Sequence, residues 1–296
     1  RAVIRYLRLL KEMPIDTDQV FVVDRNFNYL GSLLITSLLT EEPERMVETL
    51  INNDFSKPVS ADTDETEVAL LFEQRNLISA PVIDENNQLV GRITIDDVVD
   101  VIRDQAEHSV MSMVGLDEDE DVFAPIIQSS KRRSVWLGVN LVTAFIAVYF
   151  IGLFEATLQQ KIALAILMPV VASMGGIAGT QTLIIVTRGI ATGRVTTANI
   201  KTLINKEVAV SGLNGIIWSI VIGLITYYWF ADLLLSLIIA LAIITNLVVA
   251  AFSGAFLPLL LSKLKIDPAL AGGVILTTIT DVIGFVAFLG LAALFI

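Results

Sequence analysis

Five apolar segments in the second half of the chain decide what it can fold into. A helix needs roughly 20 consecutive apolar residues to cross a hydrocarbon core of about 30 Å. Lipid offers no hydrogen-bond partners, so a spanning segment must satisfy its own backbone as a helix. The sequence therefore predicts an all-α membrane domain over residues 131–296. Its five transmembrane helices are expected at about 135–154, 162–186, 208–230, 233–261 and 269–296.

The charges divide the chain into two parts. Residues 1–130 contain 10 Lys or Arg and 26 Asp or Glu, a formal net charge of −16, whereas residues 131–296 have a formal net charge of +5. The acidity of the first part excludes nucleic acid as a partner and favours cations. The absence of Cys and the single His108 argue against a thiolate or zinc site. No nucleophile–base constellation or phosphate-binding loop indicates an enzyme.

The acidic part contains an internal repeat at an offset of 60 residues. Val22-Val23-Asp24, a polar turn and residues 29–33 match Val82-Ile83-Asp84, a polar turn and residues 89–93. Each copy is typical of a strand, a turn and a second strand. A repeated unit of this kind implies a pseudo-symmetric pair that shares one core.

Helices are expected beside both hairpins. The first hairpin should be followed by a helix over residues 41–51 and the second by a helix over residues 96–113. Asp62 with Glu65 resembles a capping box, which predicts the start of a helix over residues 66–74. The acidic part is therefore expected to be an α+β domain.

The repeat resembles a tandem CBS-domain pair. Residues 80–84 and 91–97 of the second copy carry the resemblance. The first copy lacks the usual opening strand and helix, and the chain opens on Arg1 rather than Met, so we expect a truncated start and a fragment of a longer protein. The expected domains are a first repeat over 1–51, a second over 52–102, and a connecting helix with an acidic linker over 103–130.

The CBS resemblance also implies one nucleotide position. In CBS domains the positions of Thr94 and Asp97 often contact the ribose and phosphate of an adenine nucleotide, so ATP is a candidate ligand of the second repeat. The first copy has Leu34 and Ser37 at these positions, which limits the pair to one such site. The alternative is that Thr94 and Asp97 only cap the next helix.

The connecting helix carries a stripe of acids. Asp97, Asp100, Asp104 and Glu107 recur three or four residues apart, so they share one helix face and repel one another. They are either a solvated face or a set of oxygen ligands for a hard divalent cation. The separate acidic run at residues 117–121 is expected to be solvated.

The fifth apolar segment contains one charge, Asp281, near its middle. A carboxylate there costs on the order of 2.5–3.5 kcal/mol on insertion scales, so it is a functional candidate. Thr277, Thr278 and Thr280 can bond backbone or line a wet path, and nearby glycines permit close helix packing. The alternatives are a protonated acid bonded to a neighbouring helix, or a site for a cation or proton.

The second apolar segment has unusual polar content. Pro169 removes one helix hydrogen bond, and three glycines expose backbone and permit close packing. Thr180 and Gln181 place polar groups at membrane depth. Glycines alone are weak evidence, but together with Thr-Gln they predict a pore wall.

Basic residues orient the spans. Nine Lys or Arg are expected on one side and Lys161 alone on the other, which places the acidic domain in the cytoplasm and Ile296 outside. The nine are Lys131, Arg132, Arg133, Arg188, Arg194, Lys201, Lys206, Lys263 and Lys265.

The chain as a whole resembles the MgtE family of magnesium channels. The matching motifs are residues 174–181 with Arg188-Gly189, residues 267–269 and residues 280–284. The order of parts also matches: a CBS pair, a connecting helix and five spans. The family's acidic N-terminal helical domain is missing. Ile177 stands where the family usually has an Asn associated with the ion path.

The resemblance implies a homodimer in a bacterial-type inner membrane, with a pore between the second and fifth spans of each copy. Mg²⁺ would be both substrate and regulator. Asp281 would contact the hydrated ion, the Thr277 carbonyl would be a second contact, and Mg²⁺ bound at the acids of the connecting helix would close the pore. The implied pore-lining residues are Gly175, Gly176, Ile177, Thr180, Gln181 and Gly273.

Two other functions remain open at this point. An ion-coupled divalent cation carrier could use Asp281 as its coupling acid. A membrane sensor without transport could report adenylate levels through its CBS repeats.

Overall fold

The computed structural model describes residues 1–14, 17–42, 44–51, 57–116, 123–196 and 198–296. The predicted solvated run at residues 117–121 lies outside these residues. The chain forms two compact units, residues 1–107 and residues 108–296, and each is described by itself.

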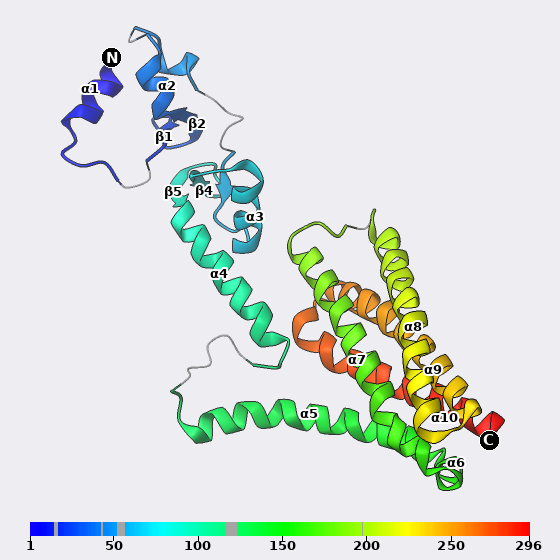
Figure 1. Cartoon of the computed structure of the whole chain (residues 1–296). Helices are drawn as coiled ribbons and strands as arrows, with labels where there is room; N and C mark the ends of the chain where they lie inside the picture. The colour runs from blue at the N-terminus through cyan, green and yellow to red at the C-terminus, as the bar shows by residue number, and fades with distance from the viewer. Residues whose placement is uncertain (15–16, 43, 52–56, 117–122, 197) are drawn as a thin grey trace. The chain divides into compact units, whose positions relative to one another are not determined.

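The first unit contains two copies of one hairpin (Figure 1). Strands β1 (Gln19–Val23) and β2 (Tyr29–Leu34) pair antiparallel, as do β4 (Ser79–Ile83) and β5 (Leu89–Thr94). The second copy has a third strand, β3 (Val59–Ser60), which pairs parallel with β4. The remaining elements are α1 (Ala2–Leu9), α2 (Ile35–Thr40), the 3₁₀ turn η1 (Val47–Thr49), α3 (Glu65–Arg75) and α4 (Ile95–Ser112).

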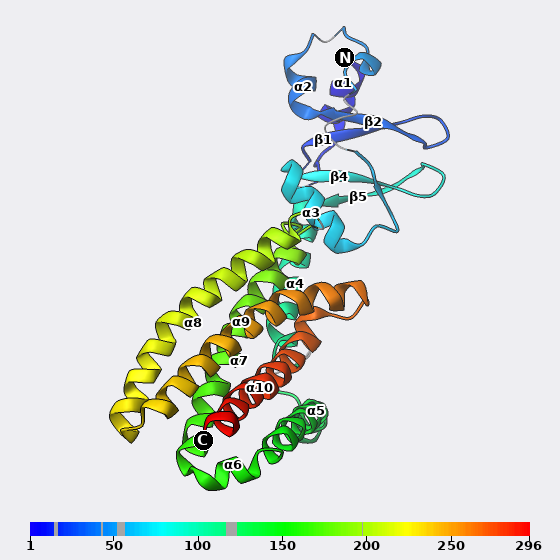
Figure 2. The ribbon, with the colours of Figure 1, turned by 90° about the vertical axis from the view of Figure 1, so that its right-hand side faces the viewer.

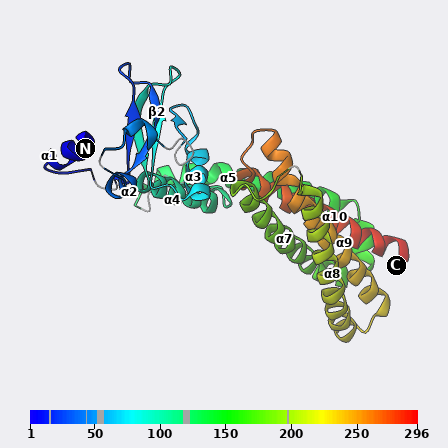
Figure 3. The ribbon, with the colours of Figure 1, turned by 90° about the horizontal axis from the view of Figure 1, so that it is seen from above.

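The two hairpins contact each other through equivalent residues. Leu89 N donates to Phe27 O and Tyr29 N donates to Asn87 O, both at 2.9 Å. Phe27 and Tyr29 of the first hairpin lie 60 residues before Asn87 and Leu89 of the second. The two hydrogen bonds are therefore equivalent, as a pseudo-two-fold pair requires. Figures 2 and 3 show the hairpins side by side with their turns at the same end. The sequence repeat is thus a structural repeat.

A buried polar link lies at the opposite ends of these strands. Gln19 Nε2 donates to Ser79 O at 2.8 Å and to Ser79 Oγ at 3.1 Å. Ser79 Oγ in turn donates to Asp18 Oδ1 at 2.6 Å. Gln19 and Ser79 are again equivalent positions, so the symmetry relates two different side chains that bond to each other.

The core of the second repeat is apolar and well buried. It is made by Val59, Val68, Ala69, Phe72, Leu77, Ala80 and Val98, which come from β3, α3, β4 and α4. Because α4 supplies Val98 to this core, the repeat fixes the start of the connecting helix.

Three predictions for the first unit were wrong in detail. No α-helix covers residues 41–51; α2 begins at Ile35 directly after β2 and ends at Thr40. The residue that caps α3 is Asp64, whose Oδ1 accepts from Thr66 N at 2.9 Å, and not Asp62. The first copy also does not lack its opening helix, since α1 precedes β1, although the described residues contain no counterpart of β3.

The second unit contains five helices that are long and apolar enough to cross a membrane. They are α5 (Ile126–Gly152), α7 (Ile162–Ala191), α8 (Ile200–Phe230), α9 (Leu233–Lys263) and α10 (Pro268–Phe295); the short α6 (Glu155–Gln160) joins α5 to α7. The predicted fold class, a CBS pair followed by an all-α domain of five spans, is confirmed.

Helix α9 is the centre of the bundle. It packs against α7, α8 and α10, and it lies between α8 and the other two in Figure 2. Half of its apolar window is buried, against 6% for α5, which packs mainly on α10. The buried cluster includes Val171, Ile239, Ile243 and Phe288 from three of these helices.

Two helices begin well before the predicted apolar segments. Helix α5 starts at Ile126 and carries Lys131, Arg132 and Arg133 within its first turns. Helix α8 starts at Ile200, eight residues before the predicted position, and carries Lys201 and Lys206. Hydropathy detects only the part of a helix that is apolar, so helical ends with polar side chains were missed.

An ion pair joins the loop before α7 to the start of α9. Lys161 Nζ bonds Asp232 Oδ2, and Asp232 Oδ1 accepts from Leu235 N at 3.0 Å as the cap of α9. The Lys161 ammonium, followed by the Leu235 N–H, lowers the pKa of Asp232 below its usual value. The carboxylate therefore contributes stability that is present above the unfolded pKa of about 3.9 and is lost as pH falls through the folded pKa.

We expect Asp232→Asn to lower the thermal midpoint of the detergent-solubilised chain at pH 7 and to have a smaller effect at pH 3. The control is Glu155→Gln in α6, an exposed acid bonded only to Gln159 at 3.1 Å. An equal loss at both pH values would show that the charge of Asp232 is not what stabilises the helix start.

Candidate functional site

Helices α7 and α10 pack through two reciprocal contacts. A Cβ at Gly179 would lie 3.0 Å from the Leu276 side chain, and a Cβ at Gly272 would lie 3.0 Å from the Leu183 side chain. Leu276 of α10 thus occupies the space at Gly179 of α7, and Leu183 of α7 occupies the space at Gly272 of α10. On each helix the glycine and the leucine are four residues apart. Small residues permit such close approach where lipid supplies no hydrophobic driving force between helices.

These contacts fix the register of the two helices. Gly179 lies opposite Leu276 and Leu183 lies opposite Gly272, so α7 and α10 run antiparallel. Counted from these contacts, Asp281 lies opposite Met174, three residues or about 4.5 Å from the level of Ile177. The acid of the fifth span therefore lies at the depth where the motif of the second span, residues 174–181, begins.

The faces of α7 and α10 that do not pack inward are mixed, with polar residues beside the exposed Ile184, Ile185 and Ile275. Ile177, Thr180 and Gln181 on α7 are exposed, and so is Thr277 on α10. By contrast, the exposed face of α8 is made of residues such as Leu213, Ile217, Ile220 and Leu224. We call the exposed residues 177, 180, 181 and 277, together with Asp281, the polar face.

Asp281 is half-buried at the edge of the polar face. Its carboxylate makes no hydrogen bond or ion pair with any residue that the structure describes. The Thr277 hydroxyl donates to Gly273 O at 2.9 Å, and the Thr277 carbonyl accepts from Thr280 Oγ1 at 3.0 Å. The expected interhelical partner for a protonated Asp281 is therefore not found among these residues, and the acid is available to a cation or to its water.

The three glycines that were predicted to line the pore differ in their exposure. Gly176 and Gly273 are partly exposed, whereas Gly175 is buried and faces α9. The two adjacent glycines of the motif thus lie on different sides of α7. Gly175 accommodates a neighbouring helix, and Gly176 has no atom within 4 Å of its would-be Cβ.

Sequence analysis did not single out Asn246, the side chain that Gly175 faces. It lies near the middle of α9, is fully buried, and donates from Nδ2 to Val171 O at 2.9 Å. A single Asn within 31 residues that are otherwise mostly apolar was the available signal.

A second buried charge was also missed. Glu207 on α8 is 5% exposed and lies 3.4 Å from Lys206 Nζ. Glu207 lies just before the predicted span, which starts at residue 208, so the apolar segment did not include it. Glu207 does not belong to the polar face, since α8 packs chiefly on α9.

The acids of α4 lie along one exposed face, as the spacing predicts. Asp100 Oδ1 and Asp104 Oδ1 are both 3.4 Å from Arg103 Nη2. Within the described part of one chain, no three His, Asp or Glu residues are grouped closely enough to hold a metal ion. A regulatory site at Asp97, Asp100, Asp104 and Glu107 therefore needs oxygens from beyond this helix.

Thr94 and Asp97 bond to each other. Asp97 Oδ2 accepts from both Thr94 N and Thr94 Oγ1 at 3.1 Å. This is a capping-box contact at the start of α4. Asp97 therefore accepts the Thr94 N–H at the start of α4, while a nucleotide contact at these residues stays a prediction.

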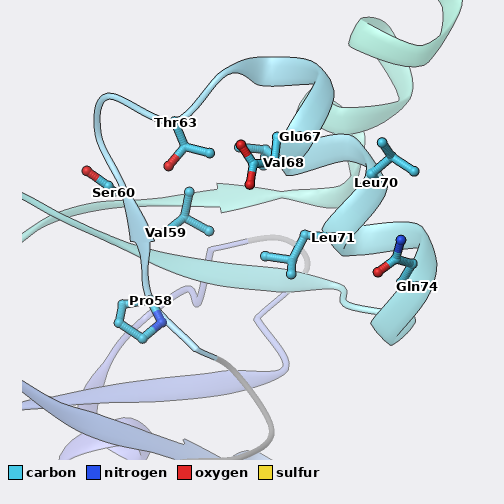
Figure 4. A pocket seen from close by; sticks show the side chains of 9 residues that line it. All are labelled: Pro58, Val59, Ser60, Thr63, Glu67, Val68, Leu70, Leu71 and Gln74. Carbon is cyan, nitrogen blue, oxygen red and sulfur yellow. The ribbon is translucent and has the colours of Figure 1, made fainter. Parts of the chain in front are cut away.

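A hollow of about 350 Å³ lies elsewhere in the second repeat, between β3 and α3 (Figure 4). Val59 and Leu71 form apolar walls, and Ser60, Thr63 and Glu67 lie at its rim. Neither Thr94 nor Asp97 lines it, so it is separate from the predicted nucleotide position.

The last turns of α4 contact the start of α10 within the second unit. His108 Nε2 lies 3.2 Å from Asp267 Oδ2, and Asp267 Oδ1 accepts from Ala269 N at 2.8 Å as the cap of α10. The helix that carries the acidic stripe therefore ends against the helix that carries Asp281.

A substitution at Gly254 tests the packing of α9 against α7, which positions the polar face. A Cβ at this position would lie 2.6 Å from Gly179 O and 3.2 Å from Leu183 N, so α9 and α7 would have to separate. We expect Gly254→Ala to destabilise the protein by about 1–3 kcal/mol, as overpacking usually does. Thermal unfolding in detergent measures this.

The matched control is Gly212→Ala on α8, whose Cβ would meet nothing within 4 Å. It should not destabilise, because Ala is the better helix former. Equal midpoints for the two variants would contradict the proposed close contact of α7 and α9.

The fold and the polar face define a multi-pass membrane protein that carries a tandem CBS pair. A family model described as MgtE, divalent cation transporter, matches residues 168–291, and the CBS domain model matches residues 53–104. The chain is therefore similar to the MgtE family, as the sequence motifs predict.

Two curated relatives match nearly the whole chain. The magnesium transporter MgtE of Bacillus subtilis is 32% identical over 98% of this chain and 64% of its own length. The magnesium transporter MgtE of Enterococcus faecalis is 27% identical over 93% of this chain and 60% of its own length. The chain thus spans less than two thirds of the relatives that it matches.

One solved structure resembles the first unit. It is the cytosolic domain of the Mg²⁺ channel MgtE in complex with ATP, 34% identical over 34% of this chain and 40% of that chain, with a TM-score of 0.32. A TM-score this low does not equate the two folds, so the ATP seen there assigns no ligand to this chain.

Proposed function

We propose that the chain transports Mg²⁺ across a membrane as a homodimer, with the ion path along the polar faces of α7 and α10. The observation that carries the proposal is Asp281, a half-buried acid at membrane depth with no partner among the described residues. Similarity to a family described as divalent cation transporters supports the choice of a divalent ion.

The chemistry of Mg²⁺ suits this surface. The ion prefers octahedral oxygen ligation and loses water reluctantly, so it usually keeps several waters. Two symmetry-related copies of Asp281 would repel each other strongly unless a cation lay between them. Thr180, Gln181 and the Thr277 carbonyl would offer oxygens to the ion's water shell, whereas Ile177, within one helical turn of the level of the acid, can only narrow the path.

The distribution of aromatic and basic residues between the two ends of the helices supports the predicted orientation. Exposed Tyr149 on α5 and Tyr227, Tyr228 and Trp229 on α8 lie near the ends that carry no cluster of basic residues. Aromatic residues favour the membrane interface, and Lys and Arg favour the cytoplasmic side. We infer a bacterial-type inner membrane with the CBS pair in the cytoplasm and Ile296 outside.

Regulation by internal Mg²⁺ is the second part of the proposal. With Mg²⁺ at the exposed acids of α4, shared with the second copy, repulsion within a part of formal charge −16 falls and the closed arrangement is favoured. The contact of His108 with Asp267 supports a path from α4 to α10. When internal Mg²⁺ falls, the acids repel and the pore opens.

Transport is tested by Mg²⁺ influx into liposomes with an internal dye. We expect Asp281→Asn to lower influx at least about tenfold, because loss of roughly 1.4 kcal/mol of ion binding has that effect. The control is Glu207→Gln, which removes the other buried acid without touching the polar face. Influx that survives in Asp281→Asn would move the ion site elsewhere.

The same measurement separates the two other candidate functions. A coupled carrier requires an imposed proton or sodium gradient for uptake, whereas a channel conducts Mg²⁺ down its own gradient. A sensor without transport gives no influx with any variant, but binds ATP in a manner that Asp97→Ala abolishes.

Gating is tested by neutralising the acidic stripe with Asp97→Asn, Asp100→Asn, Asp104→Asn and Glu107→Gln together. Asparagine at 97 keeps an oxygen for the Thr94 cap, so α4 should still form. We expect influx to persist at internal Mg²⁺ concentrations that shut off the native chain. Unchanged shut-off would refute sensing by these residues.

A further inference from the structure

The Asn246 side chain fills a space between three helices. It extends from α9 into a gap bounded by Gly175 and Val171 of α7 and by Gly284 of α10. A Cβ at Gly284 would lie 2.6 Å from Asn246 Nδ2 and 3.1 Å from Val171 Cγ1, and a Cβ at Gly175 would overlap the amide itself. Both glycines therefore provide room for this one side chain.

Burying the Asn246 amide at this position costs free energy. Asn246 is fully buried, and its Oδ1 has no hydrogen-bond partner among the described residues. Burying a polar group without a partner costs more free energy than one interhelical hydrogen bond in a membrane gains on average. The single bond from Nδ2 to Val171 O therefore does not explain Asn246 by stability alone.

The position of the amide relates it to the polar face. On α7, Gly175 is two residues before Ile177; on α10, Gly284 is three residues after Asp281. The register described above places Asp281 opposite Met174, between Val171 and Gly175, the two residues of α7 that bound the amide. The width of the amide thus sets how far apart α7 and α10 are held at the depth of Asp281.

We propose that Asn246 is a positioning residue for cation selectivity, which acts through Gly175 and Gly284 by fixing the spacing and rotation of α7 and α10 at the level of Asp281. This inference rests on the proposed function, since the polar face must be the ion path. Asn246 itself is buried behind that face and does not contact the ion.

The contact is tested without transport, by thermal unfolding of Gly175→Ala, Asn246→Ala and the double variant in detergent. Gly175→Ala alone should lower the midpoint, because its Cβ collides with the amide. Adding Asn246→Ala should raise the midpoint again, because the shorter side chain removes the collision. A double variant that loses the sum of the two single effects would overturn the steric contact.

A second pair keeps the test informative if Gly175→Ala does not fold. Gly284→Ala with and without Asn246→Ala probes the same amide from α10, where the closest contact is 2.6 Å. The expected rescue is the same. Asn140→Ala is the matched control: this exposed Asn on α5 bonds only Trp136 O of its own helix, at 3.0 Å, and should rescue neither glycine variant.

Selectivity is tested by influx of Mg²⁺ and Co²⁺ in liposomes for the native chain, Asn246→Ala, Asn246→Asp and Asn140→Ala. We expect the ratio of half-saturating Mg²⁺ to half-saturating Co²⁺ to change roughly three- to thirtyfold in Asn246→Ala, the range typical for residues that couple packed elements. Asn246→Asp keeps the size of the side chain and should change the ratio less. Asn140→Ala should leave it unchanged.

The outcomes separate this inference from the proposed function. If the native chain takes up neither cation, the proposed function is wrong, and the selectivity role of Asn246 is wrong with it. If the native chain takes up both, and Asn246→Ala lowers the amount of folded protein without changing the ratio, only the positioning role is overturned.

Discussion

The close packing of α7, α9 and α10 through glycines is the interaction on which the membrane unit depends. Gly254 brings α9 against the backbone of α7, and reciprocal leucines occupy the spaces at Gly179 and Gly272. Inside lipid, burying apolar side chains gains little, so close van der Waals contact must hold helices together. Pro169, by contrast, interrupts one helical bond without ending α7, which continues to Ala191.

This packing also determines which side of each helix is left for polar groups. The inner faces of α7 and α10 are used for contacts among helices, so Thr180, Gln181 and Thr277 remain outside, with Asp281 at the edge. Asp281 keeps its carboxylate without a protein partner within the described residues. An acid retained under these conditions is costly in lipid, which is why the proposed ion path is built on it.

The first unit obeys a different constraint, because its two hairpins contact each other through equivalent residues. The bonds between Phe27 and Leu89 and between Tyr29 and Asn87 are one contact repeated by symmetry. The two copies then diverge where they continue as helices. Thr94 and Asp97 cap α4, which runs to Ser112, whereas Leu34 provides no side-chain cap and α2 ends at Thr40. Only the second copy therefore reaches the membrane unit with a continuous helix.

The sequence by itself determined the five apolar helices, the repeat at an offset of 60 and the single charge within the fifth helix, Asp281, because hydropathy, period and charge are local properties. It placed the starts of α5 and α8 too late, because hydropathy does not detect the polar end of a helix. It placed the cap of α3 at Asp62, because the sequence does not distinguish Asp62 from Asp64 as a capping residue. Only the tertiary structure decided that Gly175 faces Asn246 while Ile177 faces outward. Adjacent residues of a helix point about 100° apart, and which direction is inward depends on where the other helices pack.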